Sequence, residues 1–72
     1  MDSFVFIGKK PSEKQCIAQI KRMAKNGANS IELQWGENWL QLEKQFNGLW
    51  SGFGFIKNID ACVLARELNH SK

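Results

Sequence analysis

The chain has 72 residues, of which 43% are hydrophobic and 24% are charged, and its formal net charge is +3. A chain of this length forms one domain at most, residues 1–72, with a core that supplies about 3–5 kcal/mol of stability. So small a core leaves little free energy to hold a strained, buried active site, and length alone therefore favours a binding protein over an enzyme.

The first half of the chain predicts a strand, a helix and a second strand. Residues 3–7 are rich in β-branched and aromatic residues and are followed by Gly8, which is typical of a strand. Ser12 is the expected N-cap of a helix that carries apolar residues at helical spacing and stops at Asn26-Gly27. Residues 30–35 alternate between apolar and polar, as a half-buried strand does.

The second half begins with a segment that fits two descriptions. Residues 39–46 have an apolar stripe both at strand spacing and at helical spacing. Because Trp39 follows the turn residue Gly36 so closely, we favour a hairpin strand over a helix. Residues 49–56 then predict another strand, and residues 59–68 predict a closing helix.

The expected order is β-α-β-β-β-α, an α+β two-layer sandwich. Its sheet is mostly antiparallel, and both helices cover one face. The expected core consists of Val5, Ile7, Ile17, Ile20, Ile31, Leu33, Ile56, Leu64 and Leu68.

Residues 51–56, Ser-Gly-Phe-Gly-Phe-Ile, are the most specific feature of the sequence. Strand alternation places Phe53 and Phe55 on one face, and Trp50 and Ile56 on the other. Glycine weakens a strand, so the two glycines indicate that another group approaches closely there.

The first strand divides in the same way, with Val5 and Ile7 on one face and Phe4 and Phe6 on the other. If the two aliphatic residues meet the helices, the phenylalanines of both strands point outward. A bare sheet face with several phenylalanine rings is a platform on which bases stack.

Two segments resemble the signature motifs of the RNA-recognition motif. Residues 5–10 (VFIGKK) are similar to the shorter motif, and residues 51–58 (SGFGFIKN) to the longer one, although Ser51 replaces its basic residue. The resemblance implies that the two motifs lie on adjacent central strands and that Phe6, Phe53 and Phe55 stack on RNA bases.

We therefore expect a non-enzymatic module that binds single-stranded RNA or DNA through an aromatic sheet face. The expected contacts are Phe6, Phe53 and Phe55, with Lys9, Lys10 and Lys57 at the strand ends. The alternative is a small regulatory protein, compatible with an accessory protein of a mobile element, that binds a partner protein or homodimerises. Its interface is expected to comprise Phe4, Phe6, Phe53 and Phe55, because monomers seldom leave such apolar patches bare.

No catalytic, metal-binding or cofactor-binding constellation is predicted. His70 is the only histidine, and Cys16 and Cys62 are too far apart in sequence to suggest a zinc site. The sequence shows no signal peptide or membrane span, so we expect a cytoplasmic protein whose two thiols are free and buried.

Overall fold

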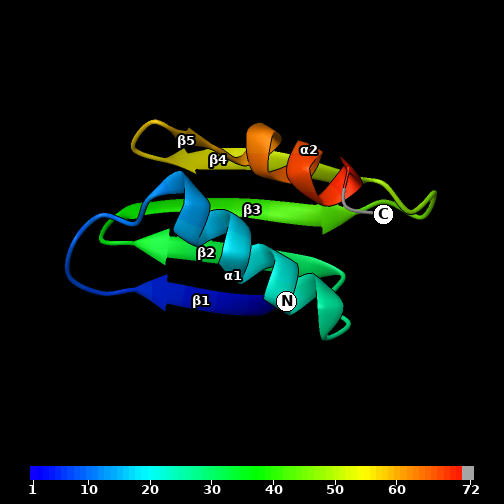
Figure 1. The fold of residues 1–72 in the computed structure, drawn as a ribbon, viewed down its shortest axis with the longest axis horizontal. Helices are drawn as coiled ribbons and strands as arrows, with labels where there is room; N and C mark the ends of the chain where they lie inside the picture. The colour runs from blue at the N-terminus through cyan, green and yellow to red at the C-terminus, as the bar shows by residue number, and fades with distance from the viewer. Residues whose placement is uncertain (71–72) are drawn as a thin grey trace.

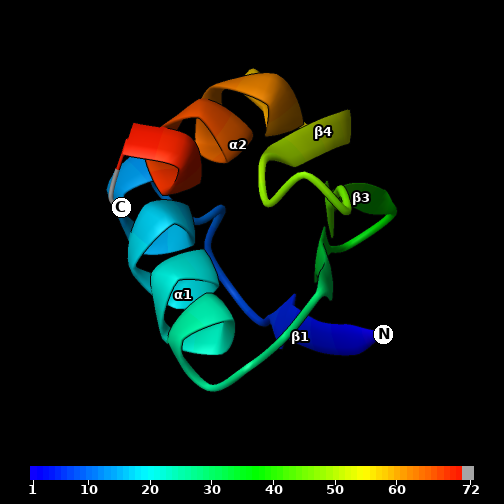
Figure 2. The same ribbon diagram turned by 90° about the vertical axis from the view of Figure 1, so that its right-hand side faces the viewer.

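The structure, a computed structural model that describes residues 1–70, is a sheet with two helices on one face (Figures 1 and 2). The elements are β1 (Asp2–Phe6), α1 (Glu13–Lys25), β2 (Ser30–Trp35), β3 (Asn38–Lys44), β4 (Trp50–Ile56), β5 (Ile59–Asp60) and α2 (Ala61–His70). The strands lie in the order β1-β2-β3-β4-β5; β1 is parallel to β2, and the other neighbours are antiparallel. The predicted α+β sandwich is confirmed, and β5 is an additional strand.

Helix α1 begins and ends where its sequence predicts. The Ser12 side chain accepts a hydrogen bond from the Gln15 backbone N–H (3.1 Å), and the Gln15 side chain accepts one from the Ser12 N–H (2.8 Å). This reciprocal capping box satisfies two amides that a helix start otherwise leaves unpaired. At the other end, Gly27 has φ +97°, a left-handed conformation that glycine adopts without steric cost.

The ambiguous segment is strand β3, as the hairpin interpretation predicts. Its register with β2 sets Leu42 opposite Ile31 and Leu40 opposite Leu33, and all four side chains are fully buried. A helix would not give both leucines this pairing, so burial against β2 decides between two conformations that the local pattern allows.

Helix α2 begins two residues later than its sequence predicts. Ile59 and Asp60 pair with the end of β4, and the Asp60 side chain accepts a hydrogen bond from the Cys62 N–H (2.8 Å), as an N-cap does. The start of α2 then lies directly on β4, because a Cβ atom at Gly52 would collide with the Ala61 carbonyl. Gly52 is thus the point where helix backbone approaches strand backbone.

The core lies between the sheet and the helices. Of the expected core residues, the structure buries Ile20, Ile31, Leu33, Ile56, Leu64 and Leu68, and Ile17 packs against them half-buried. The prediction that Val5 and Ile7 lie in the core is wrong, since their side chains are 51% and 91% exposed. Of the two free cysteines, Cys16 is buried as expected, but Cys62 is exposed.

The two faces of β1 are exchanged relative to the prediction, so that the face expected to point outward meets the helices. Phe4 pairs with Leu33 and Phe6 with Trp35, so both phenylalanines lie on the helix side of the sheet. Both faces of this strand are apolar, so alternation alone does not say which one turns inward. Phenylalanine has more apolar area to bury than valine, and Phe6 accordingly packs against the core.

Candidate binding surface on the open face of the sheet

The sheet has one face that no helix covers, which we call the open face (Figure 2). The strand register arranges its side chains in rows that run across the sheet. The row at one end comprises Val5, Gln34, Trp39, Phe55 and Asp60, and the next row comprises Ser3, Glu32, Gln41 and Phe53. The β1–β2 half of this face is mainly polar, and the β3–β4 half is aromatic.

Three rings form what we call the aromatic patch: Trp39, Phe53 and Phe55. Their side chains are 42%, 67% and 63% exposed. Trp39 lies directly opposite Phe55 in the register, and its ring centroid is 5.8 Å from that of Phe53. The Trp39–Phe53 separation is typical of aromatic rings in contact, and Phe55 lies opposite Trp39 and lines the same surface hollow, so the three residues form one apolar surface.

Gly54 gives the aromatic patch its shape. Its φ of +88° is left-handed, and a Cβ atom there would lie 2.9 Å from the Trp39 carbonyl oxygen and 3.5 Å from its indole ring. The absence of a side chain lets the indole lie over the strand. The same residues, with Glu37 and Asn38, line a surface hollow of about 350 Å³.

Charge is divided unevenly between the two sides of the molecule. Among residues 1–70, the side chains that the register places on the open face include Glu32, Glu43 and Asp60 but no Lys or Arg. The exposed cations of the helices, Lys14, Lys21, Arg22, Lys25 and Arg66, belong to the opposite layer. The aromatic patch therefore lies in an acidic surround, although the net charge of the chain is +3.

The predicted site residues are brought together only in part. Phe53 and Phe55 lie together on the open face, whereas Phe4 and Phe6 contact each other edge to face on the helix side, with ring centroids 4.9 Å apart. Strands β1 and β4, which carry the two motifs, are separated by β2 and β3, so the adjacent arrangement implied by the resemblance is not found.

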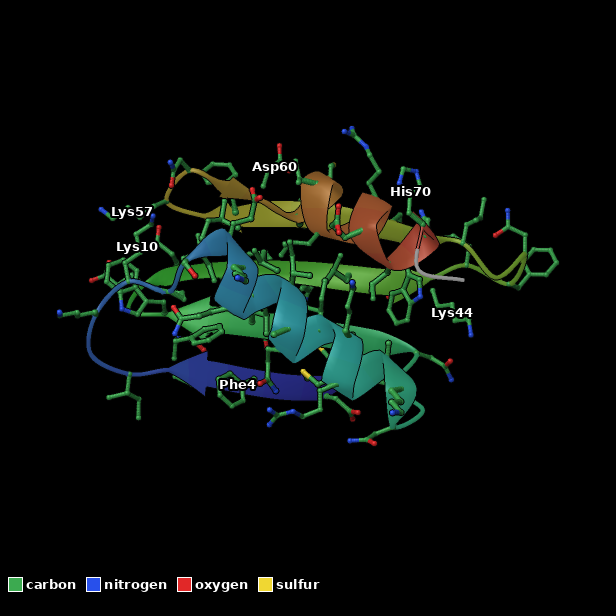
Figure 3. All side chains as sticks on the ribbon, in the orientation of Figure 1. Phe4, Lys10, Lys44, Lys57, Asp60 and His70 are labelled. Atoms are coloured by element: carbon green, nitrogen blue, oxygen red, sulfur yellow. The ribbon has the colours of Figure 1, made fainter. Side chains whose placement is uncertain are left out.

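The predicted lysines are exposed and lie outside the paired strand residues. Lys9 and Lys10 follow β1, and Lys57 forms the turn after β4 with φ +55°. Figure 3 shows Lys10 and Lys57 near the same end, with Lys44 at the other end. Lys57 is therefore the predicted cation that follows the patch strand directly.

Trp39 is the site residue that sequence reasoning missed. The signal was present, because in a strand Trp39 has the opposite parity to the buried Leu40 and Leu42 and so must point away from the core. The helical alternative for residues 39–46 obscured it.

No group of three or more metal-ligating side chains occurs in the described part of the chain. Neither of its helices is long and apolar enough to cross a membrane. Comparisons with family models, with curated proteins and with solved structures found no match.

Proposed function

We propose that this protein is a non-catalytic binding module whose aromatic patch receives a partner protein with a basic surface. One observation carries the proposal: Trp39, Phe53 and Phe55 are exposed together on a face whose paired strand positions, within residues 1–70, bear carboxylates and no lysine or arginine. Protein interfaces are enriched in aromatic residues at their centres and have polar rims, which is the composition of this face.

Charge favours a protein over a nucleic acid at this site. Affinity for a nucleic acid comes largely from lysine and arginine contacts with phosphates, and Glu43 of β3 and Glu32 of β2 would repel those phosphates. The same carboxylates attract a partner that surrounds an apolar side chain with lysine or arginine.

The same charges disfavour a homodimer formed by two open faces. Packing one copy on another would set the carboxylates of both copies in one interface, and like charges brought together there cost several kcal/mol. A partner of opposite charge avoids this cost.

Peptide display selection tests the proposal with a random library in place of a chosen partner. The library is selected on the wild-type protein and counter-selected on the Phe53→Ser variant. We expect enriched peptides with an aromatic or aliphatic residue flanked by lysine or arginine. The Phe46→Ser variant is the matched control, because Phe46 is fully exposed in the β3–β4 turn, outside the patch, and it should retain those peptides.

Charge reversal separates the two classes of partner. Glu32→Lys is expected to weaken the selected peptides about tenfold, since one well-placed rim charge contributes on the order of 1 kcal/mol. The same substitution would strengthen the binding of a single-stranded RNA or DNA oligonucleotide of mixed sequence. Saturable oligonucleotide binding that Phe53→Ser abolishes and Glu32→Lys strengthens would replace the protein partner with a nucleic acid.

A further inference from the structure

The two edges of the sheet differ in how many of their outer backbone groups have hydrogen-bond partners. At the β4 edge, the Asn69 side chain bonds both backbone groups of Trp50, the Cys62 thiol lies 3.5 Å from the Gly52 carbonyl oxygen, and β5 pairs with the end of the strand. These contacts occupy the Trp50 backbone groups, the Gly52 carbonyl and the end of β4, which another strand would need for pairing. At the β1 edge, over residues 1–70, no side chain or loop makes a hydrogen bond to the outer backbone groups.

The open edge is also apolar. Strand β1 is the border of the sheet in Figure 1; Phe4 and Val5 in it are 36% and 51% exposed, and Ile7, which follows it, is 91% exposed. Soluble proteins usually protect such an edge with a charge, a proline or a bulge. Between Ser3 and Ile7 the sequence has no charge and no proline, so the edge lacks these common safeguards.

We propose that β1 pairs antiparallel with β1 of a second copy, so that two five-stranded sheets form one continuous sheet. The observation that selects a second copy is the charge order of residues 2–10, which begin with Asp2, are uncharged from Ser3 to Gly8, and end with Lys9-Lys10. An antiparallel copy brings the acid of each strand to the base of the other, whereas a parallel copy sets like charges together.

The residue pattern fixes the register. Opposite residues in antiparallel strands share a face, so the two-fold axis must lie midway between the two copies of one residue. With the axis at Val5, Val5 meets its own copy and Phe4 meets Phe6, and pairing continued one residue beyond β1 sets Ser3 opposite Ile7. Asp2 then lies close to the bend that follows β1 in the other copy, which contains Gly8 and Lys9. This register covers the exposed valine and isoleucine on the open face, and it joins the phenylalanines on the helix side.

The dimer has a consequence for the open face. A two-fold axis perpendicular to the sheet keeps both open faces on the same side. Each aromatic patch lies between the third and fourth strands from the dimer interface, so at about 4.8 Å per strand the two patches are roughly 30 Å apart. One partner with two sites at that spacing would bind both, and its affinity would exceed that of a single patch.

The oligomeric state tests the proposal directly. Sedimentation equilibrium of the full chain is expected to show a dimer that Val5→Lys converts to a monomer, because two lysines would meet at the axis. Gln34→Lys is the matched control, since it adds the same charge on the same face one strand further in and should leave the dimer intact. A circular dichroism spectrum confirms that each variant is folded.

Cysteine crosslinking tests the register. In a Cys62→Ser background, Val5→Cys is expected to oxidise to a crosslinked dimer, because directly opposite Cβ atoms lie about 4.5–5.5 Å apart. Ser3→Cys should not crosslink, since its two copies are separated by four residues, roughly 14 Å along the strand. Buried Cys16 does not interfere.

Two outcomes overturn the proposal. One is a wild-type protein that remains a monomer at millimolar concentration. The other is a dimer that persists in Val5→Lys but is lost in Phe53→Ser, which would place the interface on the open face. Because Val5→Lys should still bind peptides through the aromatic patch, failure of the β1 dimer is distinguishable from failure of the proposed partner site.

Discussion

The Asn69 side chain is paired with the backbone of Trp50 as a neighbouring strand would be. Its Oδ1 accepts from the Trp50 N–H at 2.7 Å, and its Nδ2 donates to the Trp50 carbonyl oxygen at 3.1 Å. One amide thereby satisfies both edge groups of a strand residue from helix α2. The contact joins the last turn of the closing helix to the start of β4 and fixes how the two pack.

We predict that Asn69→Ala lowers the free energy of unfolding by about 1–3 kcal/mol, because it leaves a partly buried donor and acceptor without their partners. Asn69→Asp should also destabilise, since a carboxylate accepts from the Trp50 N–H but does not donate to its carbonyl. Urea denaturation measures both losses. Asn29→Ala is the control, because the Asn29 side chain is exposed and makes no hydrogen bond within residues 1–70; an equal loss in this variant would contradict the role of the Trp50 contact.

Much of this fold could be predicted from local signals. The Ser12 cap, the Gly27 stop and the alternation of residues 30–35 each depend on nearby residues, and each is where the sequence places it. Contacts between distant residues were not predictable in this way. The pairing of β1 with β2 determines which face of β1 points inward. Strand β5 determines where α2 begins, and no local sequence signal indicates β5.

Glycine is required for different reasons at positions 52 and 8: Gly52 has no room for a side chain, and Gly8 has a left-handed backbone conformation. Gly52→Ala would set a methyl group against the Ala61 carbonyl, whereas Gly8→Ala meets no atom within 4 Å and only has to hold φ +89°. We expect Gly8→Ala to cost about 1–2 kcal/mol, the usual cost of a left-handed residue with a side chain. Gly52→Ala should cost more, because helix α2 must move away from the sheet.

Thermal denaturation of the two glycine variants, each compared with the wild type, gives the ranking. If Gly8→Ala is the more damaging substitution, the close contact between α2 and β4 does not limit the stability of the fold.

We predict that ionisation of the Cys16 thiol lowers the free energy of unfolding at high pH. Burial, with a smaller contribution from Glu13, raises the pKa of this thiol from 9.0 to about 11, while Lys10 partly opposes the shift. A raised pKa in the folded state means that the unfolded chain loses its proton first. The protonated thiol therefore makes its full contribution to the free energy of unfolding below pH 9. This contribution, at most about 3 kcal/mol, is lost as the pH rises toward 11.

The Cys16→Ala variant isolates this effect, because both proteins share the titration of their lysines. We expect the free energy of unfolding of the wild type to fall more steeply between pH 8.5 and about 10.5 than that of the variant. Parallel curves would show that the thiol ionises equally in the folded and unfolded states.

Only the β4 part of the candidate site could be predicted from the sequence, because the rest of the site depends on how the strands align. Phe53 and Phe55 follow from strand parity, because Ile56 must be buried and the glycines leave no competing apolar residue. Phe6 did not follow, since β1 is apolar on both faces, and the acidic surround of the patch depends on the alignment of β2 with β3 and β4. Sequence identifies the rings of one strand, but register determines which groups surround them.

The last prediction concerns the contact between Trp39 and Phe53. Their ring centroids are 5.8 Å apart at an interplanar angle of 50°, an arrangement whose pair energy is about 0.5–1.5 kcal/mol beyond the burial of area. A double-mutant cycle of Trp39→Ala and Phe53→Ala, measured by urea denaturation, should give a coupling energy in that range. The control cycle combines Trp39→Ala with Phe46→Ala, because Phe46 lies in the turn beyond the other end of β3, and it should give no coupling. Equal coupling in both cycles would indicate that the substitutions act through the unfolded chain, and the aromatic patch would then not be a preformed surface.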